Sequence, residues 1–151
     1  MAEAGEWVVE FYADESGREP CQEWANKLSP TKEAALRAAL RLVLIPRGLD
    51  IVGSEYGKSL GGGLYELRLR WTADEIRHKV LGLPPGDVGQ APEKILLRVF
   101  FCTAGRKIIL LMSGYDKAED PSERRQNREI AKARKLLTAY QEAQKRSRKK
   151  R

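Results

Sequence analysis

The sequence predicts an α+β protein whose helices pack against a largely antiparallel sheet. Three observations lead to this class: a strand and two helices at the start of the chain, three later segments with strand character, and one long basic helix at the end. The expected order is β-α-α-β-β-β-α, in which strands and helices are segregated. Segregation of this kind is typical of α+β folds, and a chain of 151 residues fits a single domain.

The first part of the chain predicts one strand and two helices. Trp7–Tyr12 places apolar side chains at every second position, which predicts a half-buried strand. Glu19–Lys27 has apolar residues at helical spacing. Thr31–Ile45 is rich in alanine and leucine on one face, and Pro46 and Gly48 are expected to stop this second helix.

The middle of the chain predicts three strands separated by loops. Residues 48–63 are expected to form a loop that closes with three glycines. Leu64–Trp71 then alternates with a period of two. Residues 72–93 contain several prolines and predict a long insert loop. Ile95–Cys102 and Lys107–Met112 follow as two strands joined by a short turn, which is the strongest hairpin signal in the sequence.

The last part of the chain carries all of the excess positive charge. Residues 121–151 contain 12 Lys and Arg against 3 Asp and Glu, whereas the first 120 residues contain 16 against 18. Residues 122–146 predict one long helix with a narrow apolar stripe, and residues 145–151 predict a disordered basic tail. This charge is explained equally well by a polyanionic partner such as nucleic acid and by a solvated basic helix.

Several functional classes lack their sequence signals. We find no cysteine–histidine cluster with metal spacing, no Walker loop and no dinucleotide fingerprint, so no cofactor or metal is expected. The lone histidine, His78, is expected at the surface, and Cys21 and Cys102 are expected to be buried free thiols. Neither a secretory signal nor an apolar run of about 18 residues is visible, so we expect a cytoplasmic protein without a membrane partner.

A group of cations on the expected strands is the main candidate for a site. Arg68 and Arg70 project from one face of their strand, and Arg98 stands alone among apolar residues on the next. An arginine in such a strand requires a partner for its charge. One interpretation is an ion pair with Glu66 across the sheet. The other is that the open face binds phosphate, for which the guanidinium fork is well suited.

Two further residues extend this candidate site toward catalysis. If the last two strands form a hairpin, Tyr115 and Lys117 lie at the sheet edge near Arg98. Attack of a ribose 2′-hydroxyl on its phosphodiester needs a proton acceptor, a proton donor and a group that stabilises charge on phosphorus. Tyrosine and lysine can handle the protons and Arg98 can stabilise the charge, without a metal.

The motifs on these strands resemble those of a known family. Tyr65-Glu66-Leu67-Arg68, then Arg98-Val99-Phe100-Phe101, then Ile108 to Leu111 and Gly114-Tyr115-Asp116-Lys117 resemble the RelE/ParE superfamily, and most closely the HigB-like, phage-derived toxins. The chain departs from the family pattern at Ser113 and Ala118. The resemblance implies a single RelE-like toxin domain over residues 1–144.

The resemblance also implies an activity, partners and residue roles. The expected activity is that of a type II toxin–antitoxin toxin, an mRNA interferase that cleaves messenger RNA on the ribosome. The expected neutraliser is a cognate antitoxin, often a helix-turn-helix protein. In this scheme Arg98, Tyr115 and Lys117 are catalytic, Glu66 orients the arginines, and RNA is held by Arg68, Arg70, Arg124, Arg125 and Arg128.

Two other functions remain open at this stage. The first is a non-nuclease inhibitor on the same fold, like the ParE-type toxins that target DNA gyrase. The second is a basic nucleic-acid-binding phage protein without toxicity, which would bind RNA or DNA with steep salt dependence.

Overall fold

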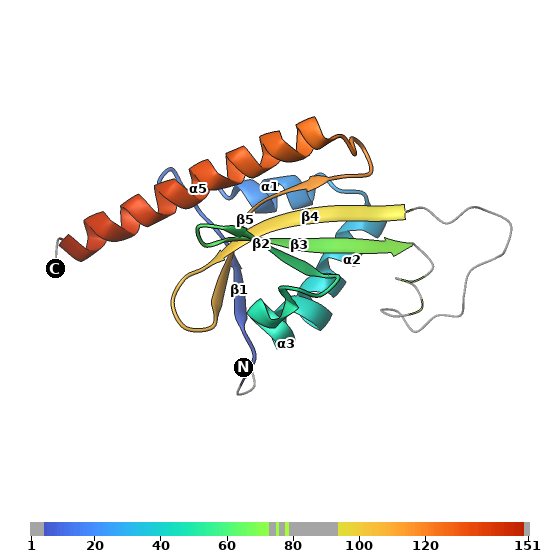
Figure 1. Cartoon of the computed structure of the whole chain (residues 1–151), viewed down its shortest axis with the longest axis horizontal. Coiled ribbons are helices and arrows are strands. Elements are labelled where there is room, and N and C mark those ends of the chain that lie inside the picture. The colour runs from blue at the N-terminus through green and yellow to red at the C-terminus, as the bar shows by residue number, and fades with distance from the viewer. Residues whose placement is uncertain (1–4, 73–74, 76–77, 79–93, 150–151) are drawn as a thin grey trace, which may run out of the picture.

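The computed structural model describes residues 5–72, 75, 78 and 94–149 and shows a mixed five-stranded sheet (Figure 1). The strand order across the sheet is β1-β5-β4-β3-β2, in which β1 runs parallel to β5 and all other neighbours are antiparallel. The α+β class is therefore confirmed. The strands are β1 (Val8–Phe11), β2 (Gly57–Gly61), β3 (Leu64–Thr72), β4 (Lys94–Thr103) and β5 (Ile108–Asp116).

Helices cover both faces of this sheet. The first face is covered by the helical segments that lie between β1 and β2, and the second is crossed by the long C-terminal helix (Figure 1). The helical segments are α1 (Pro20–Asn26), α2 (Pro30–Ala39), the π-helical η1 (Leu40–Leu44), α3 (Ile45–Arg47), the 3₁₀ segment η2 (Gly48–Ile51) and α5 (Glu123–Lys149).

Strand β2 corrects the expectation of a loop over residues 48–63. Its sequence, Gly57 to Gly61, has little intrinsic strand preference and no apolar alternation. It forms because it pairs with β3 through a two-residue turn at Gly62 and Gly63, which have φ angles of 65° and 87°. Two consecutive positive φ angles suit the right-handed twist of a hairpin, and glycine adopts them without steric cost.

The second predicted helix runs further than expected. Pro46 does not stop it, because α-helical turns continue through α3 to Arg47, but they do end at Gly48 as expected, where the 3₁₀ segment η2 follows. The geometry changes before the proline: the Ile45 N–H donates to the Leu40 carbonyl, five residues back, as in a π-helix. Proline has no N–H to donate, so a locally widened turn lets the chain pass this position.

The basic C-terminal segment is also more ordered than expected. Residues 145–149 continue α5, so the prediction of a disordered tail from residue 145 is wrong for them, and residues 150–151 lie outside the described part. Arg146 forms an ion pair with Glu15 in the loop between β1 and α1. This contact ties the end of α5 to the body of the protein. Most of the predicted insert 72–93 also lies outside the described residues, and His78 is exposed.

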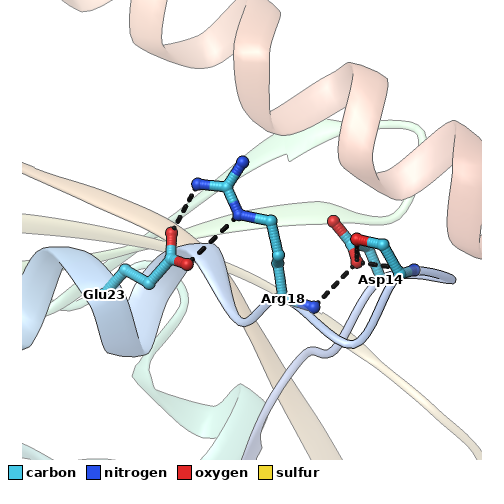
Figure 2. Close-up of polar contacts among 4 residues, drawn as sticks. Asp14, Arg18 and Glu23 are labelled. Carbon is cyan, nitrogen blue, oxygen red and sulfur yellow. Dashed lines mark hydrogen bonds and ion pairs between the residues drawn. The ribbon is translucent and has the colours of Figure 1, made fainter.

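The loop that receives Arg146 has its own hydrogen-bond network (Figure 2). The Asp14 carboxylate accepts from the Ser16 and Arg18 backbone N–H groups at 2.9 Å each, and from the Ser16 hydroxyl at 2.7 Å. The Arg18 guanidinium in turn donates two hydrogen bonds to Glu23 of α1. The hydroxyl of Ser16, together with the Arg18 N–H, lowers the pKa of Asp14.

Two apolar clusters lie on opposite faces of the sheet. The larger one joins α1, α2 and η1 to residues of β3, β4 and β5 such as Leu69, Leu97 and Leu111. The smaller one packs α5 on Phe100 and Met112. The prediction of two buried free thiols is confirmed: burial raises the pKa of Cys21 to about 12 and that of Cys102 to about 11.

Candidate functional site

The candidate site lies on the second face of the sheet, at the end that α5 leaves open. Helix α5 crosses this face near its middle, while β3 and β4 extend beyond the start of the helix toward Thr72 and Lys94 (Figure 1). Along β3 this face carries Glu66, Arg68 and Arg70 in alternate positions, as the two-residue period predicts. The open end of the sheet is therefore lined by cations.

Strand register places three of the predicted residues in one row. Arg68 of β3 lies opposite Arg98 of β4, and Arg98 lies opposite Tyr115 of β5. Directly opposed residues on one face have Cβ atoms about 4.5–5.5 Å apart. The row therefore sets two guanidinium side chains and a phenol side by side across three strands.

A β-bulge in β5 is what puts Tyr115 in this row. Phe101 pairs with Leu111, but Phe100 pairs with Ser113, so Met112 is an extra residue without an opposing partner. One inserted residue moves all following side chains to the other face of a sheet. Without the bulge, Arg98 would lie opposite Gly114, and Tyr115 would point into the apolar cluster on the far side.

Glu66 is the buried anion of the site. Its side chain is 0% exposed and accepts a hydrogen bond of 2.7 Å from Arg68 Nε. Its second oxygen, Oε2, has no hydrogen-bond partner among the described residues. The Glu66 charge also acts on Arg98, whose guanidinium it favours electrostatically. Glu66 thus makes the expected orienting contact with Arg68 directly, while it affects Arg98 through the electrostatic field of its carboxylate.

Arg98 is buried and has unused donors. It is 6% exposed, and its Nε and Nη1 atoms have no hydrogen-bond partner in the described part of the chain. Burial is the main cause that lowers the pKa of Arg98, and the Glu66 carboxylate opposes this shift. The Tyr115 hydroxyl and Ser113 Oγ beside it are likewise buried without a partner. Buried polar atoms in native proteins nearly always have a hydrogen-bond partner, so these groups call for an ordered water or a ligand.

Lys117 and Tyr115 have opposite pKa shifts. Partial burial first, and then the Arg98 charge, lower the pKa of Lys117. Burial first, and then the Glu66 charge, raise the pKa of Tyr115, although Arg98 and Arg125 oppose this. Near neutral pH the tyrosine therefore remains a neutral phenol that can donate a proton, and the lysine gives up its proton more readily than an ordinary lysine.

The residues of α5 divide into two groups. The Arg125 guanidinium lies 5.5 Å from the Tyr115 ring centroid, and its Nε donates to Glu129 at 2.9 Å. This pair covers Tyr115, which is 1% exposed. Arg124 and Arg128 are exposed on α5, and in the described part of the chain neither forms an ion pair or hydrogen bond with the strand residues. The structure thus brings Arg125 to the site and leaves the other two at the surface.

An ion pair that the sequence did not predict fixes the end of β5. Lys32 of α2 contacts Asp116 Oδ2 on the first face of the sheet, and Asp116 is 3% exposed. Asp116 Oδ1 also accepts from the Ala118 N–H at 3.0 Å, and the Lys117 N–H donates to the Leu96 carbonyl at 2.8 Å. These contacts hold the backbone from which Tyr115 and Lys117 project. Asp116 could be recognised in the sequence as part of the Gly-Tyr-Asp-Lys segment, but its partner, 84 residues away, could not be predicted.

A titration of Lys117 tests the electrostatics of this cluster. We expect NMR to give Lys117 a pKa below 10.5, its ordinary value, and the exposed variant Arg70→Gln to raise it by removal of a nearby positive charge. In the pH range between the folded and unfolded pKa values the unfolded chain binds more protons, so stability rises with pH there. The matched control is Arg41→Gln, on an exposed turn of η1. An unchanged Lys117 pKa in Arg70→Gln would contradict the assigned cluster.

The described residues contain no metal cluster or membrane span, and comparison with known proteins adds no relative. Among the described residues, no group of three or more histidine, cysteine, aspartate or glutamate side chains is arranged to hold a metal ion. None of the helices in the same ranges has the length and apolar character needed to cross a membrane. Comparison with known protein families, curated proteins and solved structures finds no match for this chain.

Proposed function

We propose that this protein is a HigB-like toxin of the RelE/ParE superfamily that cleaves messenger RNA on the ribosome. The sequence motifs support this family. The strand register supports a site, because Arg68, Arg98 and Tyr115 form one row across three strands and the charges of Arg98 and Arg68 act on Lys117. In this proposal the protein acts in the cytoplasm and a cognate antitoxin, of the helix-turn-helix class, neutralises it.

The observation that carries the proposal is the unused pair of donors on Arg98. The Nε and Nη1 atoms of the guanidinium lack protein partners and lie on different sides of the group, so one of them can donate a hydrogen bond to a phosphate oxygen while the group supplies its positive charge. Its low exposure strengthens this bond, because a charge interaction grows as solvent is excluded. Donors that are fixed before the reaction stabilise the charge that develops on phosphorus.

The roles of the neighbouring residues follow from their proton equilibria. Lys117, with its lowered pKa, takes the proton from the ribose 2′-hydroxyl. The 2′-oxygen attacks phosphorus and displaces the 5′-oxygen of the next nucleotide, which leaves a 2′,3′-cyclic phosphate. Tyr115, a neutral phenol, donates a proton to the leaving oxygen. Arg68, held by Glu66, adds positive charge beside the phosphate.

Controlled expression in bacteria tests this function. We expect the wild-type chain to arrest growth and to produce new RNA ends within translated codons. Arg98→Gln and Lys117→Met should each reduce the cleavage rate by about 100-fold, the usual effect of losing one preorganised donor. Lys117 is only partly buried, so its variant is expected to fold even if Arg98→Gln does not, and circular dichroism checks both.

The control for this experiment is Arg41→Gln, which removes one positive charge from an exposed position of η1 and should arrest growth like the wild type. Full activity in folded Lys117→Met and Arg98→Gln proteins would contradict the assigned site. A DNA-damage response without RNA cleavage would point to a gyrase inhibitor, and RNA binding without any growth arrest would point to a non-toxic nucleic-acid-binding protein. Either result would overturn the nuclease proposal.

A further inference from the structure

A second hollow lies beside the cationic row, at the edge of β3. Strand β2 pairs with β3 only as far as Leu67, and beyond it the last backbone contact is the Arg68 N–H to the Tyr56 carbonyl at 2.8 Å. Where β2 is absent, a cavity of about 310 Å³ opens along β3. Its lining in the described part of the chain consists of Glu55, Tyr56, Arg68, Arg70, Trp71 and Glu75.

The hollow has a fixed aromatic wall. The Tyr56 backbone is held on both sides, since its N–H donates to Ser54 Oγ at 3.1 Å and its carbonyl accepts from Arg68. The Arg47 guanidinium lies 5.9 Å from the Tyr56 ring centroid and restrains the ring. Trp71 also lines the hollow, but it is 6% exposed and belongs to the larger apolar cluster, so the aromatic wall is mainly the Tyr56 ring. Aromatic walls of this kind stack with the planar bases of single-stranded nucleic acid.

Charges of both signs line the same hollow. Arg68 and Arg70 supply guanidinium donors, while Glu55 is an exposed carboxylate that supplies acceptors. Guanine presents the complementary pattern: its O6 and N7 atoms accept from arginine, and its N1–H and amino group can donate together to a carboxylate. Cytosine has one exocyclic donor group, and adenine lacks the paired O6 and N7 acceptors.

We propose that this hollow binds a guanine base of the RNA substrate, next to the phosphate that Arg98 receives. The inference rests on the proposed function, because Arg68 lines the hollow and also belongs to the cationic row. Glu66 holds the Nε of Arg68 and thus fixes the side chain between the two positions. The base in the hollow then sets the nucleotide at which the chain engages RNA.

Isothermal titration of the full-length protein with GMP, AMP, CMP and UMP tests this inference. The four nucleotides carry the same phosphate, so differences among them report the base. We expect GMP to bind about tenfold more tightly than the other three, a typical effect of one bidentate base contact. Glu55→Gln should reduce the preference to about twofold, and Tyr56→Ala should weaken all four nucleotides by about tenfold through loss of stacking.

The matched control is Glu33→Gln, which neutralises an exposed carboxylate of α2 and should keep the full preference for GMP. Equal affinity for the four nucleotides, a preference for another base, or an undiminished GMP preference in Glu55→Gln would overturn the inference. RNA cleavage combined with equal nucleotide affinities would refute the guanine site but support the nuclease activity. A preference for GMP without growth arrest or RNA cleavage would support the guanine site but refute the nuclease activity.

Discussion

Replacement of Glu66 by leucine is expected to lower the free energy of unfolding by about 3–5 kcal/mol, the usual cost of removing one partner from a buried charge pair. Glu66 is fully buried, and it is the anion that favours the charged form of Arg98 while it binds Arg68. Leucine leaves these two opposed guanidinium groups without an anion between the strands. Their mutual repulsion and the lost solvation of Arg98 then act on the folded state alone.

The measurement is urea denaturation followed by circular dichroism, with two comparisons. Glu33→Leu breaks an exposed pair with Arg37 and should change stability by less than about 1 kcal/mol. Glu66→Leu combined with Arg98→Met removes the buried cation along with the anion, and it should recover much of the loss, because an apolar replacement of a buried pair is often neutral. A Glu66→Leu protein as stable as the wild type would show that the cations do not depend on this carboxylate.

The strands that the sequence predicted are those whose pattern is dictated by burial. Segments 64–71, 95–102 and 107–112 alternate or are continuously apolar because they lie in the centre of the sheet, between two apolar clusters. Strand β2 was missed because its formation depends on hydrogen bonds to β3 and on a glycine turn, whereas β1, the other edge strand, was predicted from its own alternation. Such a strand leaves no period-two signal of its own.

The site was predictable at the level of a strand but not at the level of register. Alternation alone placed Arg68 and Arg70 on one face with Glu66. The bulge at Met112, which turns Tyr115 toward Arg98, leaves no local mark in the sequence, because methionine suits a paired position equally well. The ion pair between Lys32 and Asp116 likewise depends on how α2 packs against the sheet. Long-range packing therefore decided the details that place the candidate catalytic groups.

Helix α1 rests on the end of β5 through a contact that leaves no room for a side chain at Gly114. A Cβ atom there would lie 2.4 Å from a ring carbon of Trp24. Gly114 is paired with Val99 inside the sheet, so its backbone cannot move away from the helix without loss of the register that aligns Tyr115 with Arg98. We therefore expect Gly114→Val to destabilise the fold by about 3 kcal/mol, at the upper end of the cost of overpacking.

Thermal and urea denaturation of a double-mutant cycle separate this steric cause from others. Trp24→Leu alone leaves a cavity and should also lower the free energy of unfolding. The double variant Trp24→Leu with Gly114→Val should lose less stability than the sum of the two single losses, because valine fills the vacated space. Gly17→Ala is the matched control: nothing lies within 4 Å of its added Cβ, so its cost is confined to the strain of its φ angle of 86°. Strict additivity of Gly114→Val and Trp24→Leu would mean that α1 does not set the position of β5. Non-additive losses would instead show that the packing of α1 on Gly114 sets the position of β5, the strand that carries Tyr115 and leads to Lys117.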